Sequence, residues 1–280
     1  MMCLHPGKYG PCGKCRACRI NRQRDKKVRI CHEAEGYQYN CFLTLTYDPS
    51  RYDDSNLVKK DLQDFMKKLR RYIEPDRIKY FASGEYGESE RHHAHYHLII
   101  FGLNMYDKRV FSNHHYSVSK NVWYVDCKAW DKGFCSVAPF NEARANYTAK
   151  YVIDKINGKE ADSWYHGRTP EFCLTSRGLG LTWLNEHAPL LKEEGFIRQG
   201  KKRVPLPRYY QDKLFPKDTY RNIQWSQYKS AKSFDKFRDD YRRSRATDKE
   251  SFENWQEQVR QATARFMATK LQRKELKSHV

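Results

Sequence analysis

The sequence lacks any apolar run that approaches the roughly 20 residues of a membrane-spanning helix. Its first residues also lack the apolar core of a secretory signal peptide. These two absences predict a protein that stays in a reducing cytoplasm and has no membrane partner. A Walker-type loop, in which a glycine-rich stretch ends in Lys-Ser or Lys-Thr, is absent as well. Any unwinding of nucleic acid would therefore come from another protein.

Acidic residues are few compared with basic ones. The 280 residues include 53 Lys and Arg against 34 Asp and Glu, which gives a formal net charge of +19. Excess positive charge of this size favours a polyanionic partner such as nucleic acid. Aromatic residues make up 14% of the chain, and unpaired bases stack on aromatic rings, so single-stranded nucleic acid is favoured. A protein that is merely basic is the alternative.

The chain has nine cysteines, and in a reducing compartment we expect them to be thiols or metal ligands. Cys-x-x-Cys spacing lets two thiolates reach one metal ion from a tight turn. The first segment predicts a structural Zn²⁺ site on this basis, and its ligands would be Cys3, Cys12, Cys15 and Cys18. His5 could substitute for one of them, and free thiols on a basic arm are the alternative. An iron–sulfur run would need a fourth Cys where Arg22 stands.

Histidines alternate with other residues just before an apolar run that ends at Gly102. The run is typical of a buried strand, and alternate side chains of a strand share one face. His93, His95 and His97 therefore lie on one face, about 7 Å from one to the next. Two neutral imidazoles on one face can hold a divalent metal ion. A polar edge strand with solvated histidines is the alternative.

Three motifs resemble, in the same order, those of the HUH nucleases, which initiate rolling-circle replication. The stretch His95-Tyr96-His97 matches the His-x-His strand of that family. Residues 42–48 (Phe-Leu-Thr-Leu-Thr-Tyr-Asp) resemble its first motif, and residues 147–151 (Tyr-Thr-Ala-Lys-Tyr) resemble its tyrosine motif. The wider pattern, which includes residues 12–19, 84–87, 176–180 and 207–210, resembles the initiators of the Microviridae, specifically the gokushovirus branch. The resemblance covers roughly the first three quarters of the chain.

The resemblance implies a catalytic Mg²⁺ or Mn²⁺ ion held by His95, His97 and a carboxylate from the neighbouring strand. Glu85 fits this position because it follows the predicted strand over 78–84. Two imidazoles and a carboxylate would leave coordination positions open for a phosphate and water. The alternative for Glu85 is a role in capping the turn, and His93 is expected to be solvated. The rival carboxylates, deeper in the turn, are Glu88 and Glu90.

Two tyrosines lie four residues apart in a helix predicted over 142–156, away from its apolar stripe. The resemblance makes Tyr147 and Tyr151 the nucleophiles, with Lys150 assisting. A phenol with a pKa of about 10 is a poor nucleophile at neutral pH, so a metal ion and a nearby lysine would have to promote its attack. Two amphipathic surface tyrosines are the alternative.

Four further residues are candidates for DNA contacts. Thr44 and Thr46 share a face of the strand predicted over 41–47, although strand propensity alone explains them equally well. Arg19 lies on a basic helix that ends at Glu35, where its face could be simply solvated. Arg177 lies in a glycine-rich motif that could equally be a structural turn.

The periodicities predict an α+β fold in a β-α-β-β order followed by further strands and a helix. The helix 59–72 carries an apolar stripe, the stretch 104–121 is typical of a loop, and two short strands at 122–125 and 133–137 predict a hairpin. The resemblance implies the HUH endonuclease fold, a central antiparallel sheet with flanking helices on one face, similar to the RNA-recognition and ferredoxin-like folds. Four regions are expected: a Cys-rich arm over 1–35, the HUH core over 36–160, a loop-rich extension over 161–217 and a basic helical region over 218–280.

These expectations together describe a replication initiator in the cytoplasm of a bacterial host. It would nick single-stranded origin DNA by tyrosine attack, keep a 5′-phosphotyrosine link, free a 3′-hydroxyl primer and later rejoin the strand. A host helicase and polymerase would be its partners. The alternative is a non-catalytic, zinc-containing nucleic-acid-binding protein in which the histidines are structural.

Overall fold

The computed structural model describes residues 12–13, 15–87, 93–154, 160–200 and 202–215. The elements in chain order are α1 (Arg16–Glu35), β1 (Asn40–Tyr47), α2 (Lys59–Tyr72), β2 (Lys79–Tyr86), β3 (Ala94–Phe101), β4 (Phe111–Ser117), β5 (Val122–Cys127), β6 (Gly133–Pro139), α3 (Glu142–Asp154), α4 (Glu160–Tyr165), β7 (Phe172–Thr175), α5 (Leu181–Glu194), β8 (Phe196–Gln199), β9 (Lys202–Pro205) and α6 (Arg208–Leu214).

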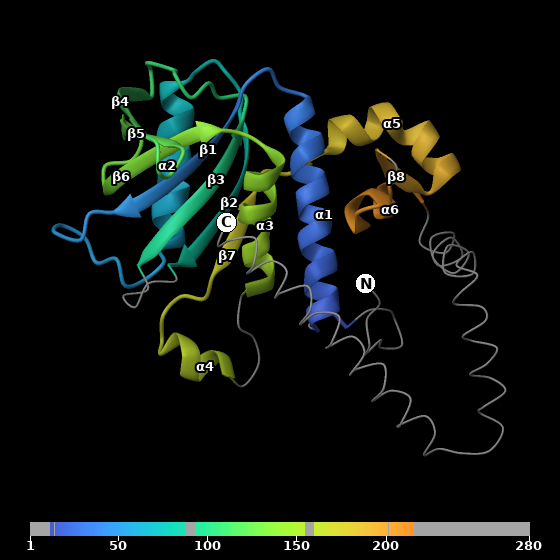
Figure 1. Ribbon diagram of the computed structural model, residues 1–280, viewed down its shortest axis with the longest axis horizontal. Coiled ribbons are helices and arrows are strands. Elements are labelled where there is room, and N and C mark those ends of the chain that lie inside the picture. The colour runs from blue at the N-terminus through green and yellow to red at the C-terminus, as the bar shows by residue number, and fades with distance from the viewer. Residues whose placement is uncertain (1–11, 14, 88–92, 155–159, 201, 216–280) are drawn as a thin grey trace. The chain divides into compact units, whose positions relative to one another are not determined.

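A seven-stranded sheet forms the centre, in the order β4-β5-β6-β1-β3-β2-β7 (Figure 1). All of its neighbouring strands are antiparallel. The antiparallel α+β prediction is therefore confirmed. So is the predicted hairpin, because β5 pairs with β6.

Helices cover both faces of this sheet, so the expectation of helices on one face is wrong. The cause lies in the unbroken apolar run of β3, where both sets of alternate side chains need cover. Leu98 and Ile100 belong to the core under α2, whereas Ile99 and Phe101 belong to the core under α1 and α3. The strand that carries the histidines is consequently held from two sides.

The helix α2 has the predicted bounds and buries the predicted stripe, which consists of Leu62, Phe65, Met66 and Leu69. It ends just before Glu74-Pro75, where proline cannot donate a helical hydrogen bond. On the other face, α3 seats Ala145 and Ala149 in the core. Small residues at these positions let α3 lie close to the sheet.

The stretch 104–121, expected to be a loop, contains the edge strand β4. A register shift between Ser112 and His115, with Asn113 at a φ of 51°, breaks the alternation by which a strand is recognised. The extension expected to be loop-rich is also more regular than predicted. Its strand β7 adds an edge to the sheet beside β2, and β8 and β9 form a hairpin. The predicted helical region over 218–280 lies outside the described residues.

A buried aromatic stack joins the last described helices to α1. The His32 ring lies flat against Trp183 of α5, with ring centroids 3.5 Å apart. Its Nδ1 lies 3.1 Å from the hydroxyl oxygen of Tyr210 on α6. The neighbouring Glu33 carboxylate accepts a hydrogen bond from the backbone N–H of Gly180 and pairs with Lys79 of β2. Helices α5 and α6 are thus fixed to the same helix that packs on the sheet.

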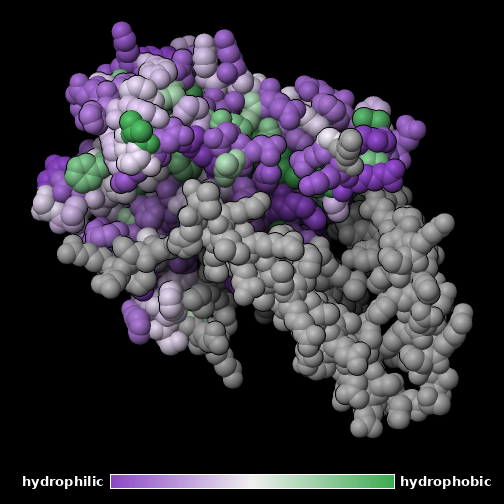
Figure 2. Space-filling model, viewed as in Figure 1, coloured by the Kyte–Doolittle hydropathy of each residue, from purple (hydrophilic) through white to green (hydrophobic). Residues whose placement is uncertain are grey.

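Among the described helices, none is both long enough and apolar enough to cross a membrane. Hydrophilic residues cover most of the visible surface of this part of the chain, with separate apolar spots (Figure 2).

Candidate metal and tyrosine site

Three predicted ligands converge in the middle of the sheet. Strands β2 and β3 are paired so that Glu85 lies directly opposite His95, with His97 two residues further along the same face. The Nε2 atoms of His95 and His97 each lie 2.7 Å from Glu85 Oε1. All three side chains thus direct a potential ligand atom to one point.

The far nitrogen of each imidazole is held by a second partner. His95 Nδ1 donates to the carbonyl oxygen of His93 at 3.0 Å, and His97 Nδ1 lies 3.0 Å from Thr44 Oγ1. Because a carbonyl can only accept, Nδ1 of His95 carries a proton, and a neutral ring then turns the Nε2 lone pair toward Glu85. Partners of this kind orient the histidine ligands of metal sites. Thr44 therefore fits an orienting role better than the direct DNA contact predicted for it.

The centre of the site is buried and lacks compensating charge. Glu85 is 2% exposed and His97 is 6% exposed. Burial lowers the pKa of His97 despite the adjacent Glu85 carboxylate. Burial also opposes the charged form of His95, but the hydrogen bond and the charge of Glu85 outweigh it and raise the pKa of His95. A carboxylate facing two imidazoles of opposed tendency is suited to a divalent cation.

Two buried oxygens beside the ligands have no hydrogen-bond partner among the described residues. They are Glu85 Oε2 and Ser83 Oγ, and Ser83 lies opposite His97 in the β2–β3 register. A buried polar atom without a partner costs roughly 1–3 kcal/mol. A cation with its hydration water would satisfy both oxygens, so the residues present fit a metal ion.

Tyr147 extends from α3 to this cluster. Its hydroxyl lies 3.4 Å from His97 Nε2, and its ring meets the His97 ring edge-on at a centroid distance of 5.0 Å. The side chain is nevertheless 43% exposed. Solvent and the metal-ligand cluster therefore both reach the same phenol.

The remaining members of the tyrosine motif lie on the same helix. Thr148 is fully buried, and its hydroxyl donates to the carbonyl of Arg144, which seats this face of α3. Lys150 is partly exposed in the next turn. Tyr151 belongs to α3, but its side chain lies outside the described residues.

Several other predicted residues lie apart from this cluster. His93, expected to be solvated, instead pairs with the carboxylate of Asp54. Thr46 lies opposite His95 on the same face, and its hydroxyl donates to the Phe134 carbonyl at 3.4 Å. Arg177 is exposed in the turn between β7 and α5, and Arg19 lies in the first turns of α1. The rival carboxylates Glu88 and Glu90 fall outside the described residues.

The cysteine motif forms a second cluster. The Sγ atoms of Cys12, Cys15 and Cys18 all lie within 4.8 Å of one another. Cys3 and His5 lie outside the described residues. Every described cysteine is a free thiol.

Sequence reasoning missed three neighbours of the metal-ligand cluster. Ser83 and the Thr44–His97 contact follow only from strand register, which periodicity does not give. Phe134, whose side chain is 58% exposed, lies opposite Thr46 on the next strand. A lone Phe in a short predicted strand gave no signal of exposure.

Comparison with known proteins gives a consistent picture. A profile of the replication-associated protein ORF2 family matches residues 40–156, which span β1 to α3. The chain is 31% identical to the replication-associated protein ORF2 of Spiroplasma virus 4, over 73% of this chain and 67% of that protein.

Two other phage proteins are similar over comparable stretches. The replication-associated protein VP4 of Bdellovibrio phage phiMH2K is 28% identical over 72% of this chain and 66% of its own length. The replication-associated protein ORF4 of Chlamydia phage 1 is 30% identical over 73% of this chain and 53% of its own length. The chain thus spans between half and two thirds of these relatives. No solved structure matches it significantly. The shared motifs and the extent of these matches show that the chain belongs to the replication-associated protein ORF2 family.

Proposed function

We propose that this protein initiates replication by nicking single-stranded origin DNA with a tyrosine nucleophile. The observation that carries the proposal is the position of the Tyr147 hydroxyl, 3.4 Å from a nitrogen of the His95–His97–Glu85 cluster and open to solvent. Nucleophile and metal ligands at one point are what phosphoryl transfer needs, because that reaction depends on positioning and charge neutralisation. The names of the phage relatives support a role in replication.

His95, His97 and Glu85 would hold Mg²⁺ or Mn²⁺, and such an ion neutralises charge on the scissile phosphate as a Lewis acid. The side chains themselves supply the geometry. Thr44 and the His93 carbonyl fix the two rings, so the ligand atoms are arranged before DNA arrives.

The chemical step balances without any other reactant. The Tyr147 oxygen attacks the phosphorus and forms a phosphotyrosine ester, while the bond from phosphorus to the 3′ oxygen breaks. The phenol loses its proton to solvent, and the departing 3′ oxygen gains one to become the 3′-hydroxyl primer. Lys150, in the next turn of α3, would balance negative charge near the phosphate. The reverse reaction rejoins the strand.

A path for the DNA strand follows from strand register on the same face. One row of paired residues runs from His97 through Thr44 and Ser136 to Tyr124, and the next runs from His95 through Thr46 to Phe134. Phe134 is 58% exposed and Tyr124 is 37% exposed. Exposed rings on this sheet offer stacking surfaces for unpaired bases, with sequence-tolerant affinity.

The second tyrosine would serve the joining reaction. Tyr151 lies one helical turn from Tyr147 on α3, about 6 Å along the axis. While one tyrosine keeps the 5′ end, the other can attack the next origin. Because the sequence contains no Walker-type loop, a host helicase would unwind the duplex and a host polymerase would extend the primer.

The test is formation of a covalent protein–DNA adduct. Random-sequence single-stranded oligonucleotides labelled at the 3′ end are incubated with the protein and Mn²⁺. A labelled band that survives denaturant is expected, because the tyrosine retains the 5′ phosphate of the labelled fragment. Sequencing the captured DNA would define the origin.

Matched variants identify the nucleophile. Tyr147→Phe should reduce the adduct, and Tyr147→Phe/Tyr151→Phe should abolish it. Tyr72→Phe is the control, since Tyr72 is also 43% exposed on a helix but lies on α2, across the sheet. Absence of any adduct with the unmodified protein, together with intact DNA binding, would favour the non-catalytic nucleic-acid-binding alternative.

A further inference from the structure

The start of α1 is electrostatically incomplete. Its N-cap residue is Cys15, whose side chain makes no capping hydrogen bond, and its first turn contains no acidic residue. The N-terminal end of a 20-residue helix carries partial positive charge, which anionic groups stabilise. Arg16, Arg19 and Arg22 add further positive charge there. Something negative is expected at this end.

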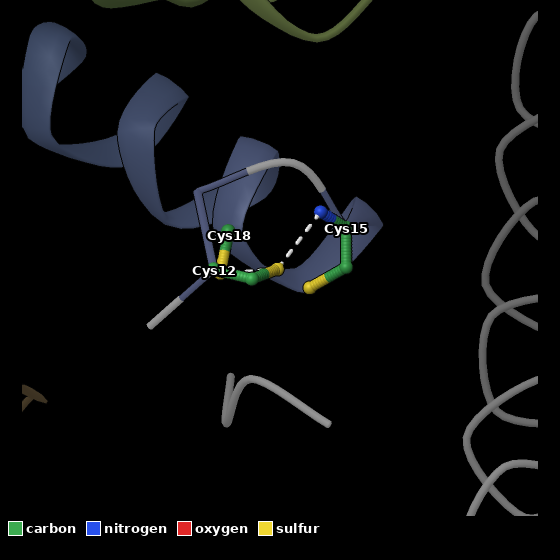
Figure 3. A group of neighbouring side chains, drawn as sticks. All are labelled: Cys12, Cys15 and Cys18. Carbon is green, nitrogen blue, oxygen red and sulfur yellow. Dashed lines mark hydrogen bonds between the residues drawn. The ribbon is translucent and has the colours of Figure 1, made fainter. Parts of the chain in front are cut away.

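Three thiols gather at this point (Figure 3). The sulfur atoms of Cys12 and Cys18 lie 3.9 Å apart, and Cys12 Sγ accepts a hydrogen bond from the backbone N–H of Cys15 at 3.3 Å. Gly13 has a φ of +72°, a left-handed conformation that allows the tight turn between Cys12 and Cys15. The turn is closed further by Arg22, which donates to the Gly13 carbonyl at 3.2 Å.

The spacing of the sulfurs distinguishes a single ion from a cluster. Zn–S bonds of about 2.3 Å at a tetrahedral angle place two sulfurs about 3.8 Å apart. The observed 3.9 Å between Cys12 and Cys18 agrees with that value. In an iron–sulfur cluster each thiolate binds its own iron, which separates the sulfurs by more than one metal centre. A single thiophilic ion therefore fits the three side chains.

We propose that Cys12, Cys15 and Cys18 bind a structural zinc ion that fixes the start of α1 against the second half of α3. Three thiolates with Zn²⁺ carry a net charge of −1, which matches both the helix end and the neighbouring arginines. This charge match is absent when the three side chains are neutral thiols.

The link to α3 follows from the packing of the two helices, which lie side by side in Figure 1. Lys27 pairs with Glu142 at 3.0 Å, and, four residues earlier in α1, Gln23 donates to the Asn146 carbonyl at 3.2 Å. The helices are thus antiparallel, and each turn back along α1 matches a turn forward along α3. The next turns set residues 15–19 alongside residues 150–154.

This register gives the zinc ion a consequence for the reaction, and that consequence rests on the proposed function. The turn of α3 beside the cysteines carries Tyr151, the second candidate nucleophile. Zinc would hold that turn in place while Tyr147 is seated independently by the sheet. Loss of zinc should therefore impair the second attack more than the first.

Metal analysis of the full-length protein, purified under reducing conditions without added metal, is the first test. About one tightly bound zinc per chain is expected. Cobalt substitution should give sulfur-to-cobalt charge-transfer absorption and tetrahedral bands, a readout that needs no variant to fold. Cys12→Ser, Cys15→Ser and Cys18→Ser should each lose the metal, whereas Cys31→Ser, a change on the same helix outside the cluster, should retain it.

A second measurement separates this site from the proposed nuclease. The variant His95→Ala/His97→Ala should keep its zinc, whatever happens to DNA cleavage. Removal of zinc should speed hydrogen exchange of the amides in residues 150–154 and leave α2 unchanged. Protein free of zinc and without cobalt–thiolate absorption would overturn the proposal, as would iron with acid-labile sulfide or a Cys12–Cys18 disulfide.

Discussion

Acid should destabilise this protein through a single buried histidine on α1. His32 is 5% exposed, stacked on Trp183. Burial, with a smaller contribution from His187, lowers the pKa of His32 from 6.5 to about 4. The folded protein therefore resists a proton that the unfolded chain accepts readily. Stability from this residue is complete above pH 6.5 and declines as the pH falls toward 4.

The magnitude follows from linkage. Each unit of pKa difference between folded and unfolded states is worth about 1.4 kcal/mol, so a change from 6.5 to about 4 corresponds to about 3 kcal/mol. That is a large fraction of the roughly 5–15 kcal/mol typical of a folded domain. Most of the loss should occur between pH 6.5 and about 4.5.

Urea unfolding at several pH values would measure the effect, with the fluorescence of Trp183, which lies against His32, contributing to the signal. His32→Phe keeps an aromatic ring in the stack but removes the titrating group and the contact with Tyr210. This variant should be less stable at neutral pH by about 1 kcal/mol, yet lose less stability on acidification. His115→Gln, a change at an exposed position, should leave the pH dependence intact. If His32→Phe and the unmodified protein lose stability in parallel below pH 6.5, the reasoning is refuted.

Three further outcomes concern the proposed chemistry. Glu85→Gln, which keeps the shape of the side chain and removes its charge, should raise the Mn²⁺ concentration needed for half-maximal adduct by at least about tenfold, since outer partners of metal sites alone are worth roughly 10–100-fold; an unchanged titration would move the third ligand elsewhere. Thr44→Val should also weaken metal use, because His97 loses the partner of its Nδ1, and rescue by Thr44→Ser but not by Val would separate hydrogen bonding from packing. Phe134→Ala should weaken binding of single-stranded oligonucleotides by about 1–3 kcal/mol, measured by fluorescence anisotropy, with Phe196→Ala outside the large sheet as the control; equal affinities would exclude Phe134 from the DNA path.

The sequence was most informative where periodicity and chemistry coincide. The apolar stripe of α2 and the alternating histidines of β3 follow from residue spacing alone, because helices and strands repeat at fixed intervals. The partnership of Glu85 with His95 and His97 was anticipated through family resemblance, and the structure brings the three together. Periodicity cannot supply strand register, so the roles of Ser83 and Thr44 around this cluster became visible only in the fold.

Other differences have local physical causes. β4 was missed because its register shift interrupts the alternating pattern, and its edge position tolerates polar residues on both faces. β7 was missed because four half-buried residues make too short a pattern. His93 was expected to be solvated, since its partner Asp54 lies 39 residues earlier in the chain. Contacts between such distant positions depend on topology and leave no trace in local spacing.

The pairing of Glu85 with His95 across two antiparallel strands has a consequence for tolerance to insertion. The distance between these ligands is set by rungs of the β2–β3 ladder, which continue from Lys79–Phe101 to Tyr86–Ala94. It does not depend on the number of residues that connect the strands. An epitope tag inserted within residues 88–92 should therefore leave the metal ligands in register, and relatives could lengthen this connection freely. Deletion or insertion of one residue inside β3, by contrast, would turn both imidazoles to the opposite face of the sheet.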